Sequence, residues 1–418
     1  MSDYLIGIDL GSYNICAAAG KINNNGVLQI SGVTSVKCSG IKNGTVVDID
    51  RAAQSIKNCC ESLERIVDTD ISEACISFPS RICEIIPNKG IIAVSSEDRE
   101  VKENDIQRVI KAAKVIVVPT DKEIVGLIPK QFTIDDLDKI KDPLGMSASR
   151  LELDAYIIAA QSTIVSNIVK SVNKAGIKLN RIVFQPVAAA KASLDDGEME
   201  MGTAIIDIGE EFSDISIFKH GNIVYTSNIK IGGNNITNDI SICLKLPYSE
   251  AEMLKIKYGK FRRDQKTDYK IKVNASYDNI VEIDHNRLLE IMEARVEEIF
   301  ELIKQKLKKS GHYDEISGIV LVGGGIALFN GICDFSSIIL EKPVRTGSPE
   351  YVGVANPSYV SAVGIVLDSE ILYDEKKKFT ENITENGKDI DWRQAVSNEK
   401  KSNKNVVSRI KNFFTEFF

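Results

Sequence analysis

The chain has 418 residues, of which 43% are hydrophobic and 27% charged, and this length is ample for the buried cores of two or more domains. The formal charge of −7 and the pI near 5.4 argue against a general nucleic-acid-binding protein, which would normally present a basic face, so no nucleic-acid partner is expected. Because the sequence has no run of about 18 apolar residues and does not begin with a basic and then apolar region, we expect neither a transmembrane helix nor a secretory signal.

The cysteines and histidines indicate no metal or catalytic site. The eight cysteines are scattered without a C-x-x-C pair, and the three histidines lie far apart at His220, His285 and His312. We therefore expect reduced, mostly buried thiols in a cytoplasmic protein. No Cys/His or Ser/His/Asp arrangement can be read, which argues against a hydrolase or a metalloenzyme, and no catalytic residue is assigned.

The first predicted element is a β-hairpin in LIGIDLGSYNICAAAG, from Leu5 to Gly20. An apolar strand leads to Asp9, Gly11 follows, and after a short polar turn an apolar strand returns. This spacing is typical of a hairpin. Backbone N–H groups in such a turn can form an anion-binding concavity, so the hairpin is a candidate phosphate loop.

The middle of the chain alternates between helical and strand patterns. Apolar residues recur at helical spacing in several segments, and a glycine at position 176 suits a helix C-cap. The predicted helices are residues 50–66, 103–115, a segment from Ser162 that ends at Gly176, a segment beginning near Pro186, and 286–311. The predicted strands are 131–134, 151–160 and a buried strand just before Gln185.

The stretch AIIDIGEEFSDISIF, residues 204–218, repeats the plan of the first hairpin about 200 residues later. The matched pairs are Asp9 with Asp207, Gly11 with Gly209 and, less closely, Asn14 with Asp214. Two such hairpins suggest two related α/β domains that face one another. Asp9 and Asp207 could hold Mg²⁺ through water, because that ion keeps much of its hydration shell.

A third element, GIVLVGGGIALFNGI at residues 318–332, is predicted to be a strand, a triple glycine and the start of a helix. Gly323, Gly324 and Gly325 would let the backbone approach a ligand closely, and a helix N-terminus favours negative charge.

The C-terminal part of the sequence consists of two segments that differ in composition and in hydrophobic pattern. Residues 374–403 are polar without a hydrophobic period and are predicted to be a flexible linker. Residues 404–418 are predicted to form an amphipathic helix: at about 100° per residue, all apolar side chains fall within an arc of roughly 140°. From Glu399 to Phe418 there are five basic and two acidic residues, a local charge of +3.

A cationic helix with a Phe-rich face on a flexible linker is typical of an interfacial membrane anchor. The alternative is a terminal helix that docks onto its own domain or onto a partner protein. The residues expected to meet the membrane are Val406, Val407, Arg409, Ile410, Lys411, Phe413, Phe414, Phe417 and Phe418.

These motifs resemble known proteins at two levels, first a superfamily and then one family within it. The two hairpins and the triple-glycine loop, in this order, resemble the phosphate and adenosine loops of the actin, Hsp70 and sugar-kinase superfamily. Five further stretches look like the bacterial cell-division FtsA family, and the resemblance runs from about residue 4 to 370 and resumes at the tail. They are SGIKNGTVVDID (39–50), GLIPKQFTIDD (126–136), IKDPLGMSASRLELDAYIIAA (140–160), IGGNNITNDIS (231–241) and SEAEMLKIKYG (249–259).

The resemblance implies an α/β, two-domain actin-like ATPase fold with duplicated mixed sheets around a nucleotide cleft. It also implies the division of the chain. Domain 1 would comprise 1–84, 163–198 and 346–373, with an inserted FtsA-type subdomain at 85–162. Domain 2 would comprise 199–236 and 316–345, with a partner-binding subdomain at 237–315. The linker 374–403 and the helix 404–418 would follow.

The resemblance further implies ATP and Mg²⁺ as ligands. Ser12 and Asn14 would join Asp9 and Gly11 in the first phosphate hairpin, and Asp207 and Gly209 would form the second. Glu252 and Lys255 would clasp the nucleoside. The positions expected around the phosphates, ribose and adenosine are Gly232, Gly233, Asn235, Gly323, Gly324 and Gly325.

Residues Glu210, Glu211 and Phe212 depart from the family pattern, which normally reads Gly-Gly-Thr or similar there. A carboxylate about 4 Å from a phosphate charge is repelled by about 4 kcal/mol at an effective dielectric near 20. Three alternatives stay open: the pair faces solvent and ATP still binds, the pair recruits metal, or the cleft has lost tight ATP binding. Gln185 replaces a family glutamate, so it could orient a water but could not accept its proton. We expect retained or weakened ATP binding with at most weak ATPase activity.

As a function, the resemblance implies an actin-like protein that polymerises and tethers FtsZ filaments to the cytoplasmic face of the membrane at the division septum. The FtsZ C-terminal peptide would bind in 237–315, with Arg295 as the candidate contact; an intramolecular salt bridge is the alternative role of that arginine. The other functions considered are a diverged paralogue that tethers another membrane assembly, such as a pilus or sporulation complex, and a phosphotransferase or chaperone-type ATPase.

Overall fold

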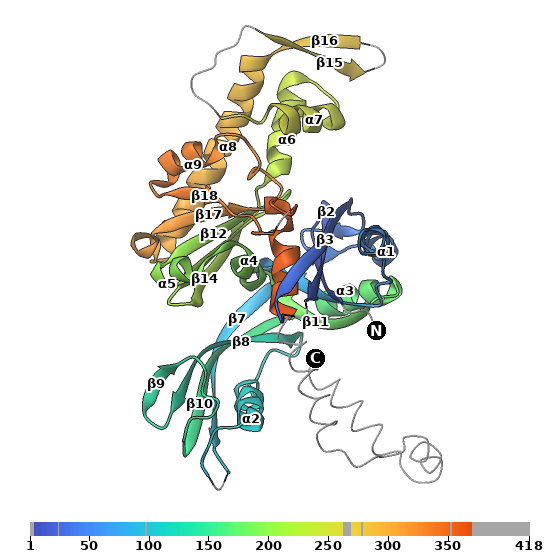
Figure 1. Cartoon of the computed structure of the whole chain (residues 1–418). Coiled ribbons are helices and arrows are strands. Elements are labelled where there is room, and N and C mark those ends of the chain that lie inside the picture. The colour runs from blue at the N-terminus through green and yellow to red at the C-terminus, as the bar shows by residue number, and fades with distance from the viewer. Residues whose placement is uncertain are drawn as a thin grey trace, which may run out of the picture. The chain divides into compact units, whose positions relative to one another are not determined.

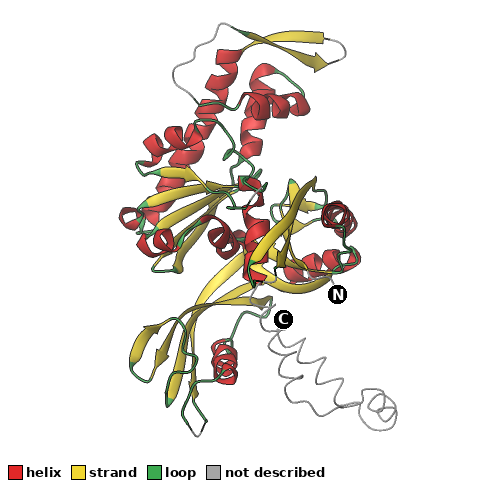
Figure 2. Cartoon of the chain, viewed as in Figure 1, coloured by secondary structure: helices red, strands yellow, loops and turns green. Residues whose placement is uncertain are grey.

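The protein is described by a computed structural model that covers residues 4–369 except 24, 97, 262–268, 277–278 and 352. This part of the chain is a mixed α/β fold built on two five-stranded sheets (Figures 1 and 2). The predicted α/β architecture with duplicated mixed sheets is confirmed. The predicted linker and amphipathic helix lie outside the described residues.

The first five-stranded sheet has the strand order β11-β6-β1-β2-β3. Its strands are β1 (Tyr4–Leu10), β2 (Asn14–Ile22), β3 (Leu28–Lys37), β6 (Glu73–Phe78) and β11 (Lys178–Phe184). Helices α1 (Ile49–Val67) and α3 (Ser162–Lys174) pack on one another and on this sheet. The short hairpin of β4 (Ile41–Lys42) and β5 (Thr45–Val46) precedes α1, which Asp48 caps by accepting a hydrogen bond from the amide of Arg51. We call this sheet, with its helices, the first lobe.

The second five-stranded sheet has the order β14-β13-β12-β17-β18. Its strands are β12 (Thr203–Ile208), β13 (Ser213–Lys219), β14 (Asn222–Ile229), β17 (Gly318–Val322) and β18 (Val344–Thr346). Helix α5 (Asp196–Met201) leads into β12, the 3₁₀ turn η2 (Tyr313–Glu315) precedes β17, and α9 (Ile332–Leu340) joins β17 to β18. This sheet, with its helices, is the second lobe.

The two predicted hairpins are confirmed and share one register. Asp9 of β1 lies opposite Cys16 of β2, and Asp207 of β12 lies opposite Asp214 of β13. The expected match of Asn14 with Asp214 is therefore wrong, because the position equivalent to Asp214 is Cys16. The two turns hold the same number of residues, so a comparison by register would have found this.

A four-stranded antiparallel sheet with the order β7-β10-β8-β9 is inserted after β6. It consists of β7 (Cys83–Ala93), β8 (Lys122–Ile134), β9 (Leu137–Ile140) and β10 (Arg150–Gln161), and α2 (Glu103–Ala113) packs on β7 and β10. The predicted helix 103–115 and strand 151–160 are confirmed, while the predicted strand 131–134 is only the end of the longer β8.

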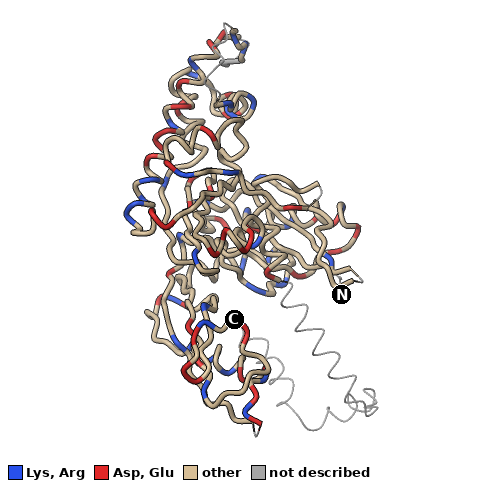
Figure 3. Tube along the Cα trace, turned by 60° about the vertical axis from the view of Figure 1, so that its left-hand side comes forward, with Lys and Arg blue, Asp and Glu red and all other residues tan. Residues whose placement is uncertain are grey.

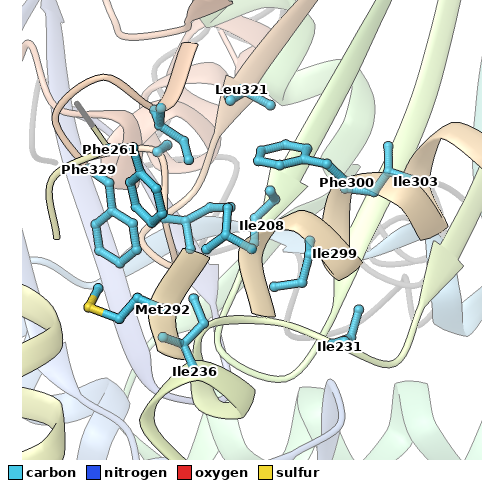
Figure 4. Packing of buried hydrophobic residues seen from close by; sticks show 14 of the residues in the cluster. Ile208, Ile231, Ile236, Phe261, Met292, Ile299, Phe300, Ile303, Leu321 and Phe329 are labelled. Atoms are coloured by element: carbon cyan, nitrogen blue, oxygen red, sulfur yellow. The ribbon is translucent and has the colours of Figure 1, made fainter. Parts of the chain in front are cut away.

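Three helices extend the second lobe: α6 (Gly233–Leu244), α7 (Tyr248–Tyr258) and the 25-residue α8 (His285–Lys309), to which β15 (Lys270–Ser276) and β16 (Asn279–Asp284) lead. One face of α8 is buried, including Met292, Phe300 and Ile303. These side chains pack with others of the lobe in a core where the rings of Phe261 and Phe329 stack at 5.6 Å (Figure 4). Ile208, Ile231 and Ile326 belong to this core, so it holds in place the loops that contain the predicted residues of the second hairpin and the triple glycine.

Two helices lie between the five-stranded sheets: α4 (Gln185–Ser193) and residues 360–369 (Figure 1). They approach so closely that a Cβ at Gly364 would lie 1.8 Å from the carbonyl oxygen of Ala188. The 3₁₀ turns η1 (Ser80–Ile82) and η3 (Pro357–Tyr359) also lie at the junction of the lobes. The cores of the two lobes are therefore joined through shared helices.

The strand, the triple glycine and the start of a helix predicted within residues 318–332 are observed. Bends and turns occupy most of residues 323–331 after β17, and α9 begins at Ile332. The apolar run after the glycines packs as a loop on the α6–α8 core, with Ile326 fully buried, rather than as a helix. Basic and acidic residues are interspersed along the described chain (Figure 3).

Candidate functional site

The predicted loops of the second lobe meet at the end of β12. The amide of Gly233, at the start of α6, donates to the carbonyl of Gly209 at 2.9 Å, and the amide of Gly325 donates to the carbonyl of Ile208 at 2.8 Å. A Cβ on Gly325 would lie 2.5 Å from the carbonyl oxygen of Gly209. This glycine is thus required by the packing of one loop on another.

Asp9 and Asp207 lie near the ends of the two matching strands and are both partly buried. Asp9 accepts a hydrogen bond of 2.5 Å from the Ser77 hydroxyl, and Asp207 accepts one of 3.0 Å from Nε2 of Gln185. Burial raises the pKa of both carboxyls, and for Asp207 the neighbouring Asp214 and Asp9 contribute, so that its pKa reaches about 7. Nε2 of Gln185 also contacts the Ser361 hydroxyl at 3.3 Å, so its amide nitrogen is engaged with protein groups.

Arg81, on η1 of the first lobe, reaches across to Asp214 of β13 in the second. Its Nη1 lies 2.5 Å from Oδ2 of Asp214, and only 13% and 9% of the two side chains are exposed. Oδ1 of Asp214 accepts a weaker hydrogen bond of 3.3 Å from Ser80. Burial raises the pKa of Asp214 and the guanidinium opposes this effect. The positive charge of Arg81 also acts on Asp9 and Asp207 and lowers the pKa of both, against the effect of burial.

Glu210 does not face solvent. Its Oε1 accepts a hydrogen bond of 3.0 Å from the Tyr248 hydroxyl, and its Oε2 lies 3.9 Å from Nζ of Lys255. Burial raises the pKa of Glu210, and Lys255 counteracts the rise. One of the three alternatives was that both glutamates face solvent. The contacts of Glu210 with Tyr248 and Lys255 show that this alternative is wrong for Glu210.

Glu252 and Lys255 are brought together on α7, as expected from their spacing. Their side chains form an ion pair at 2.7 Å, and only 3% of the Lys255 side chain is exposed. Lys255 also donates to the carbonyl of Gly233 at 3.2 Å, and Glu252 accepts a hydrogen bond of 2.5 Å from Thr237. The pair connects α7 to the first turn of α6.

Glu211 and Phe212 contact the first lobe. Oε2 of Glu211 accepts a hydrogen bond of 2.7 Å from the amide of Asn43, in the β4–β5 turn. The guanidinium of Arg81 lies over the Phe212 ring, 4.9 Å from its centroid. The two glutamates thus contact different groups, and within the described residues no set of three acidic, His or Cys side chains is arranged to hold a metal.

The remaining predicted site residues are placed as follows. The Ser12 hydroxyl accepts from the amide of Gly44 at 3.2 Å, Asn14 begins β2, and Oδ1 of Asn235 accepts from the amide of Gly232 at 3.0 Å. Gly323 has a φ of +90°, and a Cβ there would lie 2.3 Å from Oδ1 of Asp207.

Arg295, predicted to meet a partner, lies on α8 and is paired within the chain. Its Nε and Nη2 contact the two carboxylate oxygens of Asp239 at 2.5 and 3.0 Å, and Glu298 pairs with its Nη1. A quarter of its side chain, 26%, is exposed. The membrane-binding residues predicted between Val406 and Phe418 lie outside the described residues, and none of the described helices is long and apolar enough to cross a membrane.

The site fits the two parts of ATP unequally. On the side expected to hold the nucleoside, the structure has Gly323–Gly325 near the end of β12 and the Glu252–Lys255 pair on α7. On the side expected to meet the phosphates, the partly buried carboxylates of Asp9, Asp207 and Glu210 lie near Lys255 and Arg81, which are already paired with Glu252 and Asp214. A triphosphate would meet uncompensated negative charge there. These charges oppose binding of a triphosphate, and no chemical step is derived through ATP.

Sequence reasoning missed several residues that build this site: Ser77, Ser80, Arg81, Asn43 and Tyr248. A signal for Arg81 exists in the sequence, since FPSRI follows a buried strand and places a charge at the strand end where ligands bind in α/β sheets. Asn43 acts through its backbone amide in the β4–β5 turn and Tyr248 through its hydroxyl at the start of α7. Both lie far from the glutamates in the sequence, and no local pattern indicates them.

Two lobes joined by shared helices, each with a strand–turn–strand whose first strand carries an aspartate near its end, define an actin-like protein. Solved structures agree: the PilM-PilN type IV pilus biogenesis complex contains a chain with a TM-score of 0.61 at 14% identity, covering 88% of this chain and 98% of that one. MreB5 of Spiroplasma citri bound to ADP has a TM-score of 0.55 at 15% identity, covering 91% and 99%. At these identities the likeness shows the fold alone.

Sequence comparison defines the family. The family model "Cell division protein FtsA" matches residues 204–364, and the model "SHS2 domain inserted in FTSA" matches residues 82–159. The chain is 36% identical to the cell division protein FtsA of Bacillus subtilis over 376 residues, covering 87% of this chain and 83% of that protein. It is 33% identical to FtsA of Borreliella burgdorferi, covering 98% of both chains. The chain belongs to the FtsA family of cell division proteins.

Proposed function

We propose that this actin-like division protein polymerises and tethers FtsZ filaments to the cytoplasmic face of the membrane at the division septum. The observation that carries the proposal is the pattern of residues 404–418, an apolar stripe that includes Phe413 and Phe414 beside Arg409 and Lys411, in a chain of the FtsA family. The tail supplies membrane affinity, and the folded part supplies the contacts with FtsZ and with further copies.

Vesicle flotation tests the tether. The full chain is mixed with purified FtsZ polymers and anionic vesicles, and FtsZ is expected to float with the vesicles. A chain ending at Lys401 should leave FtsZ at the bottom of the gradient. Phe413→Ser with Phe414→Ser removes part of the apolar stripe and should behave like the truncation, whereas the matched change on the polar face, Asn412→Ser with Thr415→Ser, should float normally. Equal flotation of all four chains would refute the tether.

Arg295 is proposed as one contact for an acidic FtsZ peptide. Its guanidinium is already bonded to Asp239, so a peptide carboxylate would have to approach its exposed edge or displace that pair. Co-pelleting with FtsZ polymers should fall for Arg295→Glu and stay normal for Arg287→Glu, an exposed arginine on the same helix. Because Arg295→Glu also removes the Asp239 pair, unchanged thermal melting is required before reduced pelleting is assigned to the contact.

For the nucleotide we propose weakened ATP–Mg²⁺ binding with little hydrolysis, with Mg²⁺ held through water near Asp9 and Asp207. Isothermal titration of the full chain measures the affinity. A carboxylate near a phosphate costs up to about 4 kcal/mol, so Glu210→Gln with Glu211→Gln should tighten binding at least tenfold. A dissociation constant no tighter than millimolar in both proteins would remove ATP from the function.

A further inference from the structure

Three contacts join the two lobes at the turn and the second strand of the second hairpin. From the second lobe, Glu211, Phe212 and Asp214 each contact a group of the first lobe. Their partners are the Asn43 amide and the Arg81 guanidinium. We call these five residues the cross-cleft latch.

Arg81 contacts two of the other latch residues, Asp214 and Phe212, and also the turn that carries Asn43. Its Nη1 pairs with Asp214, its guanidinium lies over the Phe212 ring, and a Cβ on Gly44 would come within 2.8 Å of its Nη2. Gly44 has a φ of +72°, which a glycine adopts without strain. The Asn43–Gly44 turn therefore rests on Arg81 while the Asn43 amide is bonded to Glu211.

Both amides at the tip of this turn are satisfied by side-chain oxygens. The Asn43 amide donates to Glu211 of the second lobe at 2.7 Å, and the Gly44 amide donates to Ser12 of the first lobe at 3.2 Å. Only the first of these bonds depends on closure of the cleft. The two neighbouring amides thus provide an internal comparison between a bond across the lobes and a bond within one lobe.

Two-lobed proteins commonly close around a ligand that bridges the lobes, and phosphate groups are frequent bridges because they accept several N–H bonds. Here a carboxylate of the chain itself accepts an N–H bond from the opposite lobe, and an arginine of one lobe binds an aspartate of the other. Charge-assisted bonds of this kind are stronger than neutral ones. The Arg81–Asp214 pair is mostly buried, whereas the bond from the Asn43 amide to Glu211 is exposed.

We propose that this chain keeps its cleft closed without a ligand, and that the Glu211 carboxylate and the Arg81–Asp214 pair do the bridging that a nucleotide phosphate would otherwise do. Closure of the lobes is then independent of the nucleotide state. This goes beyond the proposed function and does not rest on it, since it concerns neither the membrane nor FtsZ nor the affinity for ATP.

Hydrogen–deuterium exchange of the purified full chain, freed of nucleotide, tests the proposal. Exchange is followed in peptides that cover residues 40–47, with and without millimolar ADP or ATP and Mg²⁺. We expect protection of the Asn43 amide without nucleotide, and a change of less than twofold when nucleotide is added. Glu211→Ala should speed exchange of this amide at least tenfold, and Arg81→Ala should do the same because the turn loses its support.

Glu61→Ala and Arg51→Ala, two exposed changes on α1 of the same lobe, are the matched controls and should exchange as the unmodified chain does. Peptides of β17 in the second-lobe core report whether a variant is folded. If the β17 peptides show that Arg81→Ala is not folded, the proposal is tested by comparing the exchange of the Asn43 amide in Glu211→Ala and in the unmodified chain. Fast exchange of the Asn43 amide that slows only with nucleotide, or slow exchange that Glu211→Ala leaves unchanged, would overturn the proposal.

Discussion

Asp207 is a carboxyl group that the fold removes from water and surrounds with other acids. Its pKa rises from 3.8 to about 7 because burial and the charges of Asp214 and Asp9 disfavour the ionised form. In the unfolded chain the same group ionises near its ordinary pKa. Between these two values the folded protein binds a proton that the unfolded protein has released, so this group favours folding below pH 3.8 and loses that contribution as the pH rises through 7.

Asp207→Asn should therefore raise stability at pH 8 and change it little near pH 4. Asparagine keeps an oxygen for the hydrogen bond from Gln185 and carries no charge at any pH. The upper limit of the gain is about 4 kcal/mol, since one pKa unit corresponds to about 1.4 kcal/mol. Thermal melting of both proteins between pH 5 and 8 gives the measurement. Parallel melting curves across this range would contradict the raised pKa.

The Arg81–Asp214 pair is mostly buried, so each partner is costly to remove alone. Arg81→Met leaves the Asp214 carboxylate without its cation and is expected to destabilise the folded state by about 3–5 kcal/mol. Arg81→Met combined with Asp214→Asn should recover most of that loss, because both charges are then absent. Urea unfolding of the two single variants and the double variant measures the coupling. Additive losses would show that the pair does not act as a unit.

A site residue could be predicted from the sequence when the pattern that indicates it lies within a few consecutive residues. Asp9 and Asp207 could be found from sequence because each ends an apolar strand and precedes a glycine turn, a pattern contained in a few consecutive residues. The partners of Glu210 and Glu211 could not, because Tyr248 and Asn43 lie far away in the chain and are brought close only by the packing of α7 and the β4–β5 turn. The two neighbouring glutamates, whose charges repel each other, therefore each accept a hydrogen bond from a different partner in the fold.

At the scale of elements, the long and periodic segments were predictable. The helix expected at 286–311 is observed as α8, His285–Lys309, because its apolar residues follow the helical period and pack in a single core. The loop at 323–331 was not predictable as a loop, since its apolar residues fit a helix equally well. Its conformation depends on the hydrogen bond from Gly325 to Ile208 of another strand.

The close contact between α4 and the helix that contains Gly364 predicts that an added side chain at this glycine destabilises the protein. A methyl group at position 364 would lie 1.8 Å from the carbonyl oxygen of Ala188, so Gly364→Ala must push the two helices apart. Overpacking costs about 1–3 kcal/mol and more where backbone has to move, so we expect a loss at or above the upper end of this range. Chemical denaturation of the purified variant gives the value.

Gly126→Ala is the matched control for that change. The nearest atom to a Cβ at Gly126 is Cβ of Ile158 at 3.8 Å, an ordinary contact, and its φ is not positive. A change within about 1 kcal/mol of zero is expected, since alanine reduces the freedom of the unfolded chain without a clash. Equal losses for Gly364→Ala and Gly126→Ala would mean that the close helix contact does not determine stability.

For the whole molecule, the proposed tether must be weak in a single copy. Burying one Phe fully is worth about 1.5–3 kcal/mol, and an interfacial helix immerses its face only in part. Each Lys or Arg near anionic lipid adds about 1 kcal/mol, but a helix of this length is marginal in water and its folding opposes binding. Firm attachment then requires several tails on one assembly, so that the second and later tails bind at a high effective concentration.

A mixing experiment follows from this dependence on the number of tails. Full-length chain is mixed with increasing amounts of the chain ending at Lys401, at constant total concentration and under conditions in which light scattering shows polymers. If both chains enter the same polymers, each polymer carries fewer tails, and the fraction of full-length chain bound to anionic vesicles should fall. At an equal mixture we expect the bound fraction to drop at least threefold, because the gain from linked tails falls steeply when neighbouring tails are lost.

The control replaces the truncated chain by one that cannot enter the polymers, such as serum albumin, and should leave the bound fraction unchanged. Co-sedimentation first establishes that the truncated chain enters mixed polymers with the full-length chain. With mixed polymers present, a bound fraction of full-length chain that stays constant at every ratio would mean that each tail binds independently. In that case one tail would be a sufficient anchor, and the need for self-association would be refuted.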